Sequence, residues 1–143
     1  MLRRKHRNTV EELEKVEMML NLAYASLAAA SRIMHNRRMR RKMLLEAALS
    51  RTALVTPDLI GALYVRGCLS IMRKASKKLR RIAESCEPPL GPKLRELAKA
   101  LSRSKGDVGG LMELVIKVRE EVRRLKSLLA ASSPASYGEV SEV

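Results

Sequence analysis

Apolar residues recur every three or four positions along most of this chain, which is the spacing of an amphipathic α-helix. The clearest stripe lies near the start of the chain and alternates these steps without interruption. It consists of Leu13, Val16, Leu20, Ala23, Leu27, Ala30 and Met34. A regular stripe of this kind packs against a partner along most of a helix. The pattern therefore predicts a long first helix in a helical bundle.

The first helix is expected to span about residues 9–52. Thr9 and Glu12 have the spacing of a capping box, in which each side chain bonds a backbone amide of the other residue. The stripe is interrupted in residues 32–42, where six of eleven residues are Arg or Lys. This segment contains no Gly or Pro, so the helix is expected to continue to the apolar positions around Leu44 and Leu49.

A second long helix is expected over about residues 57–86. Thr56 is a suitable N-cap, and Pro57 is favoured at the first helical position. The apolar stripe of this helix consists of Ile60, Tyr64, Cys68, Ile71, Ala75, Leu79, Ile82 and Cys86. Pro88 and Pro89 end it, because proline lacks the amide donor of a helix. The short link between the two long helices predicts an antiparallel hairpin.

Two shorter helices are expected at about residues 92–103 and 108–130, joined by a flexible connection over residues 102–110. The chain is thus predicted to be all-α, with a basic arm at residues 1–8, one helical domain at 9–130 and a disordered tail at 131–143. The last helix has a regular stripe with charges of both signs beside it, which favours pairing with another helix. The stripe, a candidate for self-association, comprises Leu111, Val115, Val118, Val122, Leu125 and Leu129. The pattern leaves open whether it packs within the chain or on a neighbouring subunit.

The charge of the chain points to an anionic partner. The net charge is +14 and the isoelectric point about 10.5, which favours nucleic acid, an acidic membrane surface or an acidic protein. The absence of Phe and Trp disfavours single-stranded nucleic acid, since its bases stack on aromatic rings. The candidate anion-binding residues are Arg3, Arg4, Lys5, Arg7, Arg37, Arg38, Arg40, Arg41, Lys42, Lys77, Lys78, Arg80 and Arg81.

Catalytic and metal-binding patterns are not found in the sequence. It has no glycine-rich phosphate loop, HExxH or CxxC motif, and no plausible set of Ser, His and acidic residues. We therefore expect no catalytic, cofactor or metal site, no small-molecule substrate and no enzymatic activity.

The two cysteines are expected to be reduced. Cys68 and Cys86 share one predicted helix and would lie about 27 Å apart, too far for a disulfide. No apolar run approaches the ~20 residues of a transmembrane helix. These observations predict a cytoplasmic protein whose contact with a membrane, if any, is peripheral.

Several local segments resemble the ESCRT-III family, in particular its archaeal cell-division branch. Arg40-Arg41-Lys42-Met43-Leu44-Leu45-Glu46-Ala47-Ala48-Leu49 resembles the end of that family's first helix. Ala62-Leu63-Tyr64 and Ile71-Met72-Arg73-Lys74 resemble positions of its second helix, and Pro89-Leu90-Gly91 the start of its later helical part. The sequence departs from the family at Gly61 and Gly67, where helix-favouring residues are usual, and it shows no motif for the associated ATPase.

The resemblance implies a non-enzymatic subunit that assembles into homo- or hetero-oligomers and binds or remodels anionic membrane, in cell division or vesicle formation. Arg3, Arg4, Lys5 and Arg7 would form the membrane-facing arm, and residues 37–42 would lie at the hairpin tip or on the filament surface. Two alternatives remain open. One is a helical protein that binds double-stranded nucleic acid through phosphate contacts, and the other is a helical adaptor for an acidic partner.

Overall fold

The computed structural model describes residues 2–50 and 57–131, and these residues form an all-α fold, as predicted. The helices in these ranges are α1 (Leu2–His35), α2 (Arg37–Ser50), α3 (Pro57–Glu84), α4 (Leu90–Ser102) and α5 (Val108–Ala131). The predicted Thr56 cap and the predicted tail beyond Ala131 lie outside the described residues.

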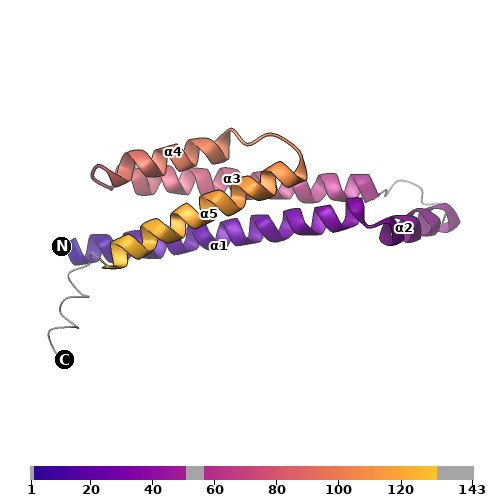
Figure 1. Cartoon of the computed structure of the whole chain (residues 1–143), viewed down its shortest axis with the longest axis horizontal. Helices are drawn as coiled ribbons and strands as arrows, with labels where there is room; N and C mark the ends of the chain where they lie inside the picture. The colour runs from indigo at the N-terminus through magenta and orange to yellow at the C-terminus, as the bar shows by residue number, and fades with distance from the viewer. Residues whose placement is uncertain (1, 51–56, 132–143) are drawn as a thin grey trace, which may run out of the picture.

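The long helices α1 and α3 run antiparallel, as the predicted hairpin requires (Figure 1). Helix α4 folds back along α3, and α5 crosses α1, so that α1 contacts both α3 and α5. Helix α2 lies beyond the end of this bundle and has few contacts with it. The bundle therefore comprises α1, α3, α4 and α5, with α2 projecting at one end.

One hydrophobic core joins the four helices of the bundle. The predicted stripe of α1 is buried from Leu13 to Ala30, and α5 buries Leu111, Val115, Val118, Val122 and Leu125. Helix α3 buries a second face beside the predicted one, with Met72, Ser76 and Ala83. The Ser76 hydroxyl donates a hydrogen bond of 2.7 Å to the carbonyl oxygen of Ala98. This bond fixes α4 against the second face of α3.

The first helix begins earlier than predicted. Helix α1 begins at Leu2, so the segment expected to be a separate basic arm continues the helix, and Thr9 lies inside α1 instead of capping it. The residues before Thr9 are mostly Leu, Arg and Lys, which favour helix and include no Gly or Pro. The carboxylate of Glu12 bonds lysine side chains, at 3.1 Å from both Lys15 and Lys78.

The prediction of one helix through residues 9–52 was also wrong, because the helix is interrupted at Asn36, between α1 and α2. The side-chain Oδ1 of Asn36 accepts a hydrogen bond of 3.1 Å from the backbone amide of Arg38. This is the contact of an N-cap residue with the second residue of a helix. The amide of Asn36 still donates to the carbonyl oxygen of Arg32 at 2.9 Å, so the helical hydrogen bonding of α1 extends up to this residue. Asn36 thus follows the end of α1 and caps the start of α2.

The later helices also differ from the prediction at their ends. Helix α4 begins at Leu90, two residues before Pro92, which leaves a short turn around Pro88 and Pro89. The last helix begins at Val108, as predicted, so the connection before it is limited to residues 103–107. The carboxylate of Asp107 stabilises this start, accepting a hydrogen bond of 2.8 Å from the amide of Gly110.

Candidate anion-binding surfaces

Helix α2 combines exposed cations with exposed leucines. Its first half carries Arg37, Arg38, Arg40, Arg41 and Lys42, all exposed to solvent. Its second half carries Leu44, Leu45 and Leu49, which are 46%, 62% and 76% exposed. The leucines do not reach the core, because α2 projects beyond the bundle.

The beginning of α3 adds further apolar side chains at the same end of the molecule (Figure 1). Leu59, Leu63 and Tyr64 are at least 42% exposed. Six of the ten exposed large apolar side chains in the described residues thus belong to α2 and the first turns of α3. We call this set the tip surface: Arg37, Arg38, Arg40, Arg41, Lys42, Leu44, Leu45, Leu49, Leu59, Leu63 and Tyr64.

The charges of the tip surface are largely uncompensated. Within the described part of the chain, Arg37, Arg38, Arg41 and Lys42 make no ion pair. Glu46 is the acidic residue of α2. Cations beside exposed leucines suit the boundary of an anionic bilayer, where headgroups bind the charges and acyl chains contact the leucines.

A second cationic surface follows α3 and α4. Arg73, Lys77 and Arg80 follow helical spacing on one side of α3. Arg95 and Lys99 lie on exposed positions of α4, and Arg103 is exposed directly after the end of α4. The guanidinium of Arg80 donates a hydrogen bond of 3.4 Å to the Ser102 hydroxyl, so the two rows of cations adjoin. We call these six residues the α3–α4 cationic face. None of the six forms an ion pair with a described residue.

One end of the α3–α4 cationic face is hollowed. A cavity of about 360 Å³ lies beside the α4–α5 connection, and its polar lining includes Arg73, Ser102, Ser104 and Lys105. No carboxylate lines it. The hollow has the charge required for a phosphate group at the end of the face.

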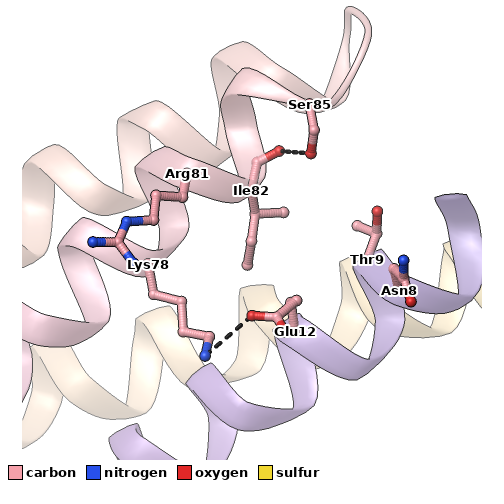
Figure 2. Close-up of a pocket in the computed structure, with 7 residues that line it drawn as sticks. All are labelled: Asn8, Thr9, Glu12, Lys78, Arg81, Ile82 and Ser85. Atoms are coloured by element: carbon pink, nitrogen blue, oxygen red, sulfur yellow. Dashed lines mark hydrogen bonds and ion pairs between the residues drawn. The ribbon is translucent and has the colours of Figure 1, made fainter.

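A second hollow, of about 280 Å³, lies at the C-terminal end of α3, between this helix and the start of α1 (Figure 2). Lys78 and Glu12 face one another across its wall, with 3.1 Å between the Lys78 ammonium and a Glu12 oxygen. The hydrogen bond from Lys78, followed by that from Lys15, lowers the pKa of the Glu12 carboxyl. Of the predicted anion-binding cations here, Lys78 is therefore neutralised within the chain, whereas Arg81 has no ion pair with any described residue.

The basic residues at the start of the chain are not brought to the tip surface. Arg3, Arg4, Lys5 and Arg7 belong to the first turns of α1, at the opposite end of the bundle from α2 (Figure 1). The predicted anion-binding residues therefore form separate groups, at the two ends of the molecule and along α3.

Helix α5 is held against α1 by polar contacts as well as by the core. The Glu17 carboxylate, which is 9% exposed, accepts hydrogen bonds from Arg123 and Lys126. Arg119 donates to Asn21 at 3.1 Å and lies 5.8 Å from the centre of the Tyr24 ring. The stripe proposed for self-association is thus packed within its own chain, with Leu129 partly buried. Self-association through this stripe stays a prediction, and it would require α5 to exchange between chains.

The sequence identified the cations of α2 but did not predict that its leucines are exposed. The spacing gives no signal of this exposure, because Leu44 falls on the three-and-four register of α1 continued through positions 37 and 41. The cations of α4 were visible in the sequence as well, but only the contact between Arg80 and Ser102 shows that they adjoin those of α3.

The remaining candidate features in the described residues are metal-binding groups, reactive cysteines and membrane-spanning helices. They contain no group of three or more His, Cys, Asp and Glu residues that could hold a metal ion. Cys68 is a free, buried thiol whose pKa is raised by burial to about 11, and Cys86 is free and half-buried. None of the described helices is long and apolar enough to cross a membrane.

Comparisons with known proteins add no assignment. No protein-family profile, no curated protein and no solved structure matches this chain.

Proposed function

We propose that this protein is a non-enzymatic, ESCRT-III-like subunit that binds anionic membrane through the tip surface and assembles there. The observation that supports the membrane part is the presence of exposed leucines on α2 next to Arg37, Arg38, Arg41 and Lys42, which form no ion pair with a described residue. The resemblance of two helical segments to the ESCRT-III family supports the assembly part.

The leucines favour a membrane over nucleic acid as the partner of the tip surface. Each basic residue close to an anionic leaflet contributes about 1 kcal/mol, and duplex nucleic acid attracts such residues as well. A phosphate backbone, however, gives leucine side chains no apolar environment. Burying one leucine in the acyl region would contribute roughly 1.5–3 kcal/mol. The leucines therefore favour binding to a membrane over binding to nucleic acid.

Co-sedimentation with vesicles of mixed neutral and anionic lipid tests the membrane part. We expect the double variant Leu45→Ser/Leu49→Ser to bind roughly tenfold or more weakly, because burial of two leucines is lost. Leu128 is a suitable control, since it is 56% exposed but lies on α5, and Leu128→Ser should bind like the wild type. Wild-type binding by the double variant would exclude insertion of the tip surface.

Electron microscopy of the protein with the same vesicles tests the assembly part separately. Filaments, rings or coated tubules are expected for an ESCRT-III-like subunit. Bare vesicles under conditions where the protein co-sediments would overturn assembly and leave membrane binding intact.

The α3–α4 cationic face supports a second candidate, binding of double-stranded nucleic acid. This face has six cations without ion pairs in the described residues, and no exposed large apolar side chain lies on α4 or on the second half of α3. Such a surface suits phosphate contacts without sequence preference. Duplex binding that falls steeply with salt, and that is lost when Arg95, Lys99 and Arg103 are changed to Glu, would support this candidate.

A further inference from the structure

Helix α1 has a third face that neither α3 nor α5 covers. The contacts with α3 and α5 account for the buried stripe and for Glu17, Asn21 and Tyr24. The remaining face carries Met18, Leu22, Ala25 and Ala29, at steps of four, three and four. Met18 is 66% exposed and Leu22 is 59% exposed. This is the spacing of a second helix-pairing seam, and we call these four residues the outer seam.

Two charges of opposite sign flank the outer seam along the same edge. Glu14 and Arg32 are 18 residues apart, which is about five full helical turns, so both project from the same side of α1. Neither forms an ion pair with a described residue. The midpoint between the two charges falls next to the midpoint of the outer seam, between Leu22 and Ala25.

We infer that the outer seam pairs with the outer seam of a second copy of this chain, in antiparallel orientation. A twofold axis at the midpoint places Met18 against Ala29 of the second copy and Leu22 against its Ala25. Each large side chain then meets a small one, which allows the two backbones to approach closely. The same axis brings like edges together, so Glu14 of each copy lies close to Arg32 of the other.

The charges favour the antiparallel orientation. In a parallel pair with the same seam, the edge that carries Glu14 and Arg32 would lie on opposite sides of the interface in the two copies, and Glu14 would be about 27 Å along the helix axis from Arg32 of the other copy, so the opposite charges could not pair. A parallel pair would also place Met18 beside Met18 and Ala29 beside Ala29, so large and small side chains would not alternate across the interface.

The pairing has a consequence for the tip surface. Because the tip surface lies at one end of α1 (Figure 1), an antiparallel dimer carries one tip surface at each end. The inference does not depend on what the tip surface binds, and it is tested without lipid or nucleic acid. The seam has only four layers, so the interface is at the small end of specific interfaces. We therefore expect a weak, reversible dimer whose population rises with protein concentration.

Sedimentation equilibrium over a range of protein concentrations tests the charge pairing. Glu14→Arg and Arg32→Glu should each weaken the dimer about tenfold, because each creates two like-charge contacts. The double variant Glu14→Arg/Arg32→Glu restores opposite charges across the interface and should dimerise like the wild type. Glu113→Arg on the exposed side of α5 is the control and should not affect dimerisation. A monomeric wild-type protein at all concentrations, or a double variant no better than either single one, would overturn the inference.

Disulfide trapping tests the orientation. Met18→Cys and Ala29→Cys chains, mixed under mild oxidation, should form a disulfide between residue 18 of one chain and residue 29 of the other. The Met18→Cys chain alone should not form a disulfide between two copies of residue 18. In the antiparallel dimer these two residues would be separated by eleven residues, or roughly 16 Å, along the helix axis. Mass spectrometry of the linked peptides distinguishes these products from disulfides of Cys68 or Cys86. A residue 18 to residue 18 disulfide would indicate a parallel pair and overturn the proposed orientation.

Discussion

At the scale of single residues, Gly61 and Gly67 show how packing decides the effect of a glycine in a helix. Both lie in α3, where glycine costs about 1 kcal/mol relative to alanine. A Cβ atom at Gly61 would lie 2.6 Å from Cγ of Met34, whereas a Cβ atom at Gly67 would meet no atom within 4 Å. Gly61 therefore allows the end of α1 to approach α3 closely.

These surroundings predict opposite outcomes for the same substitution. Gly67→Ala should raise the free energy of unfolding by about 1 kcal/mol, because alanine favours the helix and has room. Gly61→Ala should give no gain or a loss, since the side chain of Met34 would have to move. Urea unfolding followed by circular dichroism measures both, and an equal gain at the two positions would contradict the close approach of Met34.

The contacts of Glu17 with Arg123 and Lys126 predict that the stability of the fold depends on pH. Burial alone would raise the pKa of this carboxyl, but the hydrogen bonds from Arg123 and Lys126 outweigh burial, so the pKa lies below its ordinary value of 4.5. A group with a lowered pKa stabilises the fold above its unfolded-state pKa, and this contribution is lost as the pH falls through the folded-state pKa. Glu17→Gln should therefore destabilise the protein by roughly 1–3 kcal/mol at pH 7, with a smaller difference below about pH 4.

The measurement is urea unfolding of the wild type and Glu17→Gln at pH 7 and pH 3. Glu113 provides the matched control, because it is exposed on α5 and makes no ion pair with a described residue. Glu113→Gln should change stability little at either pH. A loss of stability in Glu17→Gln that is the same at both pH values would indicate packing, and not the ion pairs, as the contribution of Glu17.

At the scale of helices, α2 depends on one cap. Asn36→Ala removes the acceptor that bonds the amide of Arg38 and should destabilise α2 by about 1 kcal/mol. Hydrogen exchange followed by mass spectrometry should therefore show faster exchange in residues 37–50. Asn36→Asp keeps an acceptor at the same place and should exchange like the wild type. Unchanged exchange in Asn36→Ala would mean that the break between α1 and α2 does not depend on this cap.

The bundle could be predicted from the sequence, because a regular apolar stripe has one favourable position, facing the core. Leu13 to Ala30 in α1 and Leu111 to Leu125 in α5 are buried as the spacing requires. The second face of α3 could not be derived in this way, since Met72 and Ser76 are buried only because α4 folds back on that side. The start of α1 and the break at Asn36 were missed because helix propensity changes little from residue to residue, and at the break a single cap residue decides the boundary.

The candidate site was predictable only in part. Charge density along the sequence identified the cations of α2, but it could not distinguish Lys78, which Glu12 neutralises, from Arg81, which has no ion pair in the described residues. The partners of Glu17 lie more than one hundred residues away in the chain. Contacts of this kind depend on how α5 crosses α1, and a sequence pattern contains no information on that crossing.

At the scale of the whole molecule, the positive charge is divided between the tip surface and the α3–α4 cationic face, and the two surfaces differ in chemistry. The tip surface has exposed leucines among its charges, whereas the α3–α4 cationic face has none. Two triple variants distinguish the two surfaces. The tip variant is Arg37→Glu/Arg38→Glu/Arg41→Glu, and the α4 variant is Arg95→Glu/Lys99→Glu/Arg103→Glu, which changes two residues of α4 and the residue that follows it. Both lower the net charge of +14 by the same amount, so a difference between them cannot come from total charge.

If the tip surface binds membrane, the tip variant should bind anionic vesicles at least tenfold more weakly, while the α4 variant binds nearly like the wild type. The loss reflects about 1 kcal/mol for each cation removed and a repulsion of similar size for each carboxylate introduced. Raising the salt concentration should weaken wild-type vesicle binding only in part, because screening acts on the charges and not on the buried leucines. In the wild type, duplex DNA binding through phosphates should instead fall steeply with salt. Equal losses in the two variants, for vesicles and for DNA, would mean that binding follows net charge and that neither surface is a specific site.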